Sequence, residues 1–80
     1  MLFMAVQTHK PKHCPLNDKK PKPLWDTKSK KVKLINIYAC PPEHVLYFVL
    51  EANNFEDIQS FFMPGMTKTT VDIKPVSTMK

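Results

Sequence analysis

The amino-acid sequence predicts a single α+β domain built on a four-stranded antiparallel sheet. Its 80 residues suffice for one domain, and 42% apolar with 24% charged residues is typical of a globular chain. Four stretches have the composition of strands, and one has the spacing of an amphipathic helix. The order of these stretches along the chain predicts the topology.

The first three strands are predicted from apolar composition. The run 2–6 is too short for a helix and suits a central strand that is buried on both faces. Residues 32–40 and 44–52 are rich in β-branched and aromatic residues, which favours two further strands. Pro41 and Pro42 interrupt strand pairing between them, so the pair is predicted to form a hairpin.

One helix is predicted after the hairpin. Asn53 or Asn54 can cap its start, and Pro64-Gly65 ends it. Its apolar residues fall on one helical face, which we expect to lie on the sheet. That face consists of Phe55, Ile58, Phe61 and Phe62.

The fourth strand completes a ferredoxin-like plan. Residues 69–76 alternate in polarity, with Val71 and Ile73 predicted to point inward. The order strand, connection, strand, strand, helix, strand is that of the split βαβ or ferredoxin-like fold, with sheet order 4-1-3-2. Four prolines in the range 11–23 predict a shortened first helix, which can begin at the last of them and run towards Lys30.

The predicted sheet has one face that no helix covers. Its central strands are apolar on both faces, so the open face is expected to be covered by another molecule. A chain of 80 residues buries only about 60% of its unfolded surface, which also favours an oligomer. A second copy of the chain is the simplest cover, and we therefore expect a homodimer.

Positive charge is concentrated in one segment. Nine of the twelve lysines lie in the range 10–33, where two aspartates oppose them and leave a net charge of +7. The chain has no arginine, although guanidinium groups are preferred for bidentate recognition of phosphate. Trp25 is the one aromatic residue among these lysines. The pattern favours a solvated connection over a nucleic-acid interface, which stays an alternative.

Targeting and redox signals are few. The chain begins without a basic segment before its first apolar run, and no run approaches the roughly 18 apolar residues of a membrane span. We therefore expect a cytoplasmic protein without a membrane partner. In that compartment Cys14 and Cys40 are expected to be thiols.

Several stretches resemble a known family. They are Met1-Leu2-Phe3-Met4, Pro41-Pro42-Glu43-His44, Tyr47-Phe48-Val49-Leu50-Glu51-Ala52 and Ile73-Lys74-Pro75-Val76. With them, residues 1–9 and 32–76 look like the small muconolactone-isomerase-like proteins of the dimeric α+β barrel superfamily. The resemblance implies a homodimer with two sheets packed face to face. It does not imply isomerase chemistry, because a shared fold does not carry function.

The predicted topology gathers reactive side chains at one end of the sheet. The first strand ends there, the second strand ends there, and the third begins there. All three histidines and both cysteines belong to this group, which consists of His9, His13, Cys14, Cys40, Glu43 and His44.

Two kinds of chemistry fit these residue types. Imidazole and thiolate are ligands of zinc, so His9, His13, Cys14 and His44 are a candidate metal set, with Cys40 as another possible member. A thiolate–imidazolium pair is the second hypothesis, but neither cysteine has a glycine-rich nest or a helix start beside it.

The sequence therefore predicts a small protein that binds a small ligand or a metal at this sheet end. The candidate ligand-binding residues are His9, His44, Tyr47 and Trp25, and Trp25 can alternatively fill the space left by the short helix or pack on a partner chain. One alternative function is a cofactor-free enzyme of the dimeric-barrel type, isomerase- or monooxygenase-like. The other is lysine-driven nucleic-acid binding, which is disfavoured because 44–51 lacks a glycine–aromatic signature.

Overall fold

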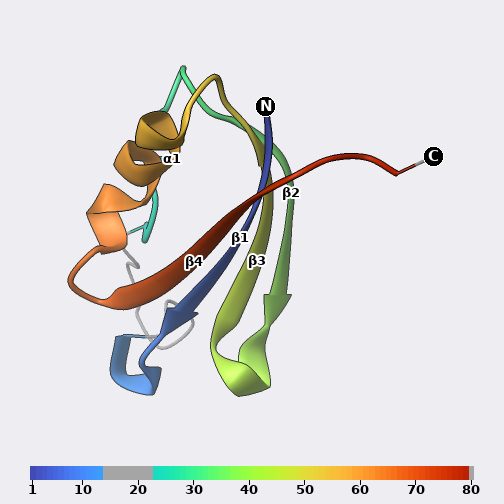
Figure 1. Cartoon of the computed structure of the whole chain (residues 1–80). Helices are drawn as coiled ribbons and strands as arrows, with labels where there is room; N and C mark the ends of the chain where they lie inside the picture. Colours follow the sequence, from blue (N-terminus) through green and yellow to red (C-terminus); the bar gives the residue numbers. More distant parts are fainter. Residues whose placement is uncertain (14–22, 80) are drawn as a thin grey trace.

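The computed structural model describes residues 1–13 and 23–79 and has one α-helix on a four-stranded sheet (Figure 1). In chain order the elements are β1 (Leu2–His9), a 3-10 turn η1 (Pro11–His13), β2 (Lys33–Cys40), a 3-10 turn η3 (Pro41–Glu43), β3 (Val45–Glu51), α1 (Phe55–Phe62), a 3-10 turn η4 (Met63–Gly65) and β4 (Thr69–Val76). The α+β class and the four-stranded sheet are confirmed.

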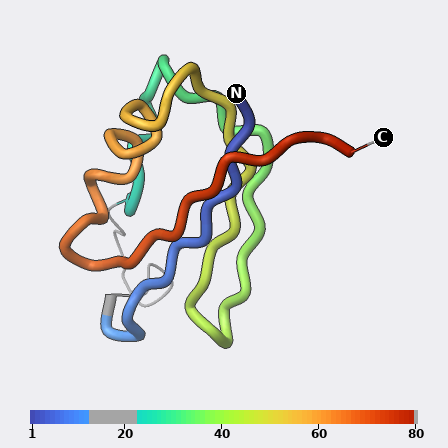
Figure 2. The backbone as a smooth tube through the Cα atoms, viewed as in Figure 1, coloured from blue at the N-terminus to red at the C-terminus, as the bar shows by residue number. Residues whose placement is uncertain are grey.

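The strands form one antiparallel sheet with the order β2-β3-β1-β4, which is β4-β1-β3-β2 when read from the other edge. The tube in Figure 2 follows β1 between β3 and β4. Ala5 lies opposite Phe48 on one side and Ile73 on the other, and these three residues share the face that α1 covers. The two central strands, β1 and β3, are therefore the two apolar strands that the sequence predicted to be central.

The core lies between the sheet and α1 and is mostly aromatic. Phe48 is fully buried, and its ring centroid lies 5.0 Å from Phe62 and 6.2 Å from Phe61 in edge-to-face contacts. Asn54 caps the helix by accepting a 2.9 Å hydrogen bond from the backbone N–H of Asp57, as its position predicted. Phe55 was expected on the buried helix face, but it is 43% exposed and lies at the first position of α1. Among the described residues, no helix is long and apolar enough to cross a membrane.

The connection before β2 differs from the prediction. The short helix expected from Pro23 towards Lys30 is wrong, because residues 23–32 form turns and bends. These residues lie against the core in irregular backbone: Leu24 is buried at 3% exposure, and the backbone N–H of Asp26 donates to Phe61 O at 2.7 Å. Such hydrogen bonds replace those that a helix would make within itself.

Two side chains fix this connection in place. Gln7, which is fully buried on β1, donates from Nε2 to Leu24 O at 2.8 Å. Trp25 packs edge to face on Phe48 with ring centroids 5.3 Å apart. Trp25 therefore packs on the core within the connection that stands in place of a first helix, which was one of its three predicted placements.

The other face of the sheet has no covering element among the described residues. Met4, Tyr47 and Tyr38 share this face: Tyr38 pairs directly with Tyr47, and Met4 pairs with Val49, two residues further along β3. Their exposures are 44%, 36% and 58%. The edge strand β2 is exposed on both faces and has a register shift between Leu34 and Asn36. A large apolar surface is therefore left open.

We expect Gly65→Ala to lower the free energy of unfolding by about 1–3 kcal/mol. A Cβ atom at Gly65 would overlap the backbone carbonyl oxygen of Leu24, which the buried connection holds in place. Urea unfolding followed by circular dichroism measures the change. Ser60→Ala on the exposed side of α1 is the control and should stay within about 0.5 kcal/mol of the parent. Equal stability of the two variants would contradict the close approach of η4 to the connection.

Candidate functional site

The candidate site is built on a direct contact between the end of β1 and the start of β3. His9 is the last residue of β1, and His44 lies between η3 and β3. The backbone N–H of His9 donates to His44 O at 3.0 Å. The two imidazole rings meet edge to face, with centroids 5.2 Å apart and planes at 80°. The antiparallel register of β1 and β3 therefore brings the two histidines together.

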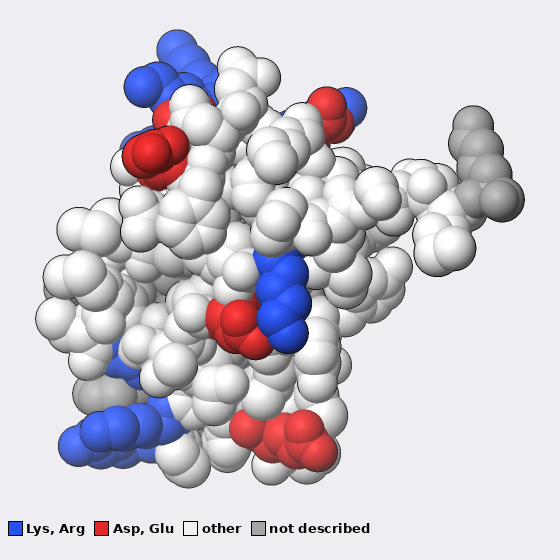
Figure 3. Space-filling model, viewed as in Figure 1, with Lys and Arg blue, Asp and Glu red and all other residues white. Residues whose placement is uncertain are grey.

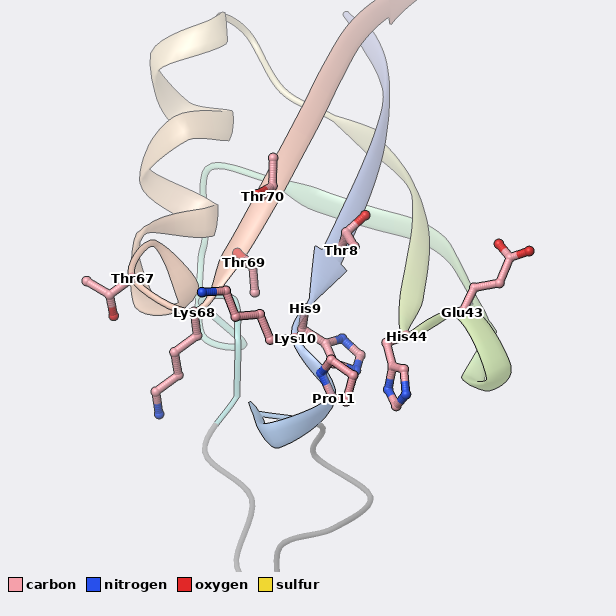
Figure 4. Close-up of a pocket in the computed structure, with 10 residues that line it drawn as sticks. All are labelled: Thr8, His9, Lys10, Pro11, Glu43, His44, Thr67, Lys68, Thr69 and Thr70. Atoms are coloured by element: carbon pink, nitrogen blue, oxygen red, sulfur yellow. The ribbon is translucent and has the colours of Figure 1, made fainter.

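A pocket of about 390 Å³ lies beside these rings (Figure 4). The end of β1, the turn before β3 and the turn before β4 all contribute to it. Its lining consists of Thr8, His9, Lys10, Pro11, Glu43, His44, Thr67, Lys68, Thr69 and Thr70. This volume is within the range of small-molecule sites in proteins.

His9 is buried without the hydrogen bonds that a buried imidazole usually makes. Its exposure is 6%, and among the described residues neither ring nitrogen has a hydrogen-bond partner. Nδ1 of His44 is also buried and unpartnered within the described part of the chain. Burial, and secondly the neighbouring His44, lower the pKa of His9 below its ordinary value of 6.5. The lowered pKa favours the neutral form of the His9 ring at pH 7.

His44 has an unusual backbone conformation. Its φ of 56° and ψ of 45° place it in the left-handed region, which non-glycine residues adopt at a cost. It is the one non-glycine residue with positive φ in the described ranges 1–13 and 23–79. This conformation lets the chain turn from η3 into β3 at the point where the His44 ring meets His9.

The other predicted site residues lie in several places. Cys40 and Glu43 lie at the same sheet end as the two histidines, and Cys40 is a free thiol. Tyr47 lies on the open sheet face, whereas His9 lies on the opposite face. Trp25 belongs to the core around Phe48 and does not line the pocket.

The predicted metal set is only partly described. Cys14 lies outside the described residues, as does the side chain of His13. Within the described residues, no group of three or more His, Cys, Asp or Glu side chains is arranged to hold a metal ion. The two described members, His9 and His44, supply fewer ligands than a tetrahedral zinc site needs.

Sequence reasoning missed the contribution of the turn before β4. Lys68, Thr69 and Thr70 line the pocket because β4 begins beside the end of β1, where Thr69 pairs with His9. The signal was present in the predicted sheet order, since the start of the fourth strand must lie next to the end of the first. Threonine and lysine have no motif of their own, so these residue types alone do not indicate a site.

Comparison with protein-family models, with curated proteins and with solved structures finds no match.

The stability of the protein should depend on pH through His9. Because the pKa of His9 is lowered in the folded state, the unfolded chain takes up a proton first as the pH falls. The pH-dependent destabilisation by His9 is absent well above the unfolded pKa of 6.5 and grows as the pH falls below it. We expect the free energy of unfolding to fall between pH 7.5 and 5.5, and to fall less in His9→Leu. Urea unfolding across this range measures both curves, and parallel curves would contradict the assignment.

Proposed function

We propose that this protein binds a small molecule in the pocket at the end of β1. The observation that carries the proposal is His9, whose two ring nitrogens are buried, lie next to the pocket and lack partners among the described residues. A buried polar group without a hydrogen bond costs about 1–3 kcal/mol. An apolar residue at this position would avoid that cost, so stability alone does not account for His9.

The backbone of His44 supports the same proposal. Residues held in a sparsely populated region of φ and ψ cluster at binding and active sites. Here the left-handed residue is the direct neighbour of the unpartnered His9, and both line one pocket. The unpartnered His9 ring and the left-handed backbone of His44 are both energetically unfavourable and are in contact. We therefore infer that both residues contact the same ligand.

His9→Leu should separate binding from stability. We expect it to raise the free energy of unfolding at pH 7 by about 1 kcal/mol, because the unpartnered imidazole is removed. It should also abolish the binding of small polar compounds that perturb the backbone amide signals of Thr8, Thr69 and Thr70 in a fragment screen by NMR. Phe55→Ser on the exposed side of α1 is the control and should keep the binding. If no compound perturbs these amides in the parent protein, the proposal fails.

We infer separately that the open sheet face packs against a second copy of the chain. Leu2, Met4, Val6, Tyr47 and Val49 are neighbours on this face through the pairing of β1 with β3. The charged residues that share the face are balanced, with Lys33 and Lys74 against Glu51 and Asp72. A surface that is apolar at its centre and neutral in charge favours its own copy. It favours a nucleic acid less, because phosphate binding needs an excess of positive charge.

The double variant Met4→Lys with Tyr47→Lys tests this assembly. We expect the parent chain to sediment as a dimer at micromolar concentration and the variant to sediment as a monomer, because four lysines would meet across the interface. Phe55→Lys adds a charge to an exposed apolar residue of α1 and should leave the dimer intact. A parent chain that is monomeric in analytical ultracentrifugation would contradict the inference.

A further inference from the structure

The charges around the His9 pocket indicate what kind of ligand it takes. Lys10 follows β1 and Lys68 precedes β4, so two ammonium groups come from different turns. The ion pair between described residues is Lys74 with Asp72, at 3.6 Å on β4, and neither pocket lysine takes part in it. Figure 3 shows lysines grouped at the lower left, where Figure 1 has the end of β1 and the turn into β4. Among the described residues, neither pocket lysine has an ion-pair partner, so the lining contains two unpaired ammonium groups.

The single acid of the lining does not offset this charge at the rings. Glu43 belongs to η3, and Figure 4 shows its carboxylate pointing away from His9 and His44. In the same view the side chain of Lys10 extends across the pocket towards the start of β4. Among the described residues, the other titratable and charged groups of the lining are thus His44, whose ring contacts His9, Lys10 from the end of β1, Lys68, whose side chain extends away from the two rings in Figure 4, and Glu43.

The unpartnered ring nitrogens select among ligands. A neutral imidazole can donate one N–H, and an imidazolium can donate two. A bound oxygen anion would accept such hydrogen bonds, and its charge would favour a proton on one of the two rings. A metal cation would instead be repelled by the lysines, and a neutral ligand would gain little from them.

The hydroxyl groups of the lining add no donors beside the rings. Thr8 and Thr70 pair directly with each other and belong to the open face of the sheet, whereas His9 lies on the opposite face, and Figure 4 shows Thr67 pointing away from the two rings. The hydroxyl of Thr69 already donates to Gly65 O at 2.8 Å, so it orients the turn instead. The donors that remain beside this space are therefore the imidazole nitrogens and the ammonium group of Lys10.

We propose that the pocket binds a small oxygen anion, a phosphate-type or carboxylate group, between the His9–His44 pair and the lysines Lys10 and Lys68, and that one proton is taken up with it. The inference rests on the proposed ligand-binding function of this pocket and specifies the ligand class. The proton that is taken up comes from solvent and resides on the histidine pair while the anion is bound.

Isothermal titration calorimetry with sulfate and with acetate tests the proposal, because neither anion titrates between pH 6.0 and 7.5. At constant ionic strength, we expect binding of at least one anion to tighten as the pH falls, by up to about tenfold per pH unit, the limit for one proton. Sulfate as the tighter ligand would indicate a phosphate-type group, and acetate would indicate a carboxylate. Repeating the titration in buffers of different ionisation enthalpy counts the protons directly.

Three variants in the pocket and one control outside it locate the bound anion. Lys10→Gln and Lys68→Gln should each weaken binding by about two- to fivefold, whereas Lys74→Gln, outside the pocket, should leave it unchanged. His9→Gln should remove the dependence on pH. The two lysine variants change exposed or half-buried side chains, so they test the proposal even if His9→Gln folds poorly.

The outcomes separate this proposal from the proposed function. If neutral compounds perturb Thr8, Thr69 and Thr70 but neither anion binds, the ligand class is wrong and the binding function stands. Anion binding that is independent of pH, or equally weakened by Lys74→Gln, would also overturn the proposal. If neither neutral compounds nor anions perturb these residues, both proposals fail.

Discussion

The alternation of side chains along β1 is the constraint on which the rest of the structure depends. This strand lies between β3 and β4, so each of its side chains faces either α1 or the open side of the sheet. Phe3 and Ala5 face the helix and enter the core, and Gln7 and His9 follow them on the same face. A strand has a period of two, so these roles cannot be reassigned without moving the whole register.

On the face of β1 that α1 covers, the first half of the strand has apolar core residues and the second half has polar residues. Gln7 Nε2 holds the connection through Leu24 O, and this one hydrogen bond joins residues that lie 17 positions apart. His9, two residues on, has no such partner among the described residues. Gln7 therefore has one partnered and one unpartnered side-chain polar atom, since its Oε1 is also buried without a partner among the described residues, whereas His9 has neither ring nitrogen partnered. This difference supports a structural role for Gln7 and is one reason to propose a binding role for His9.

The two proposed surfaces are compatible with each other. The apolar patch of Met4, Tyr47 and Tyr38 lies on the open face, whereas His9 points to the opposite face at the end of the sheet. A second copy that covers the patch would leave the His9 ring on its own side of the sheet. Assembly would then supply the apolar burial that a chain of 80 residues lacks, and the polar pocket would not need to contribute to stability.

Sequence by itself determined the strands, the capped helix and the meeting of His9 with His44, because local composition and the antiparallel plan suffice for these features. The Asn54 cap and the inward Val71 and Ile73 have the same origin. Tertiary structure decided what depends on contacts distant in sequence. The irregular connection is held by hydrogen bonds to Gln7 and Phe61. The pocket includes Lys68 because the turn before β4 lies beside the end of β1. The hydrophobic periodicity of one segment does not indicate which distant residues it contacts, since those contacts depend on the packing of the whole chain.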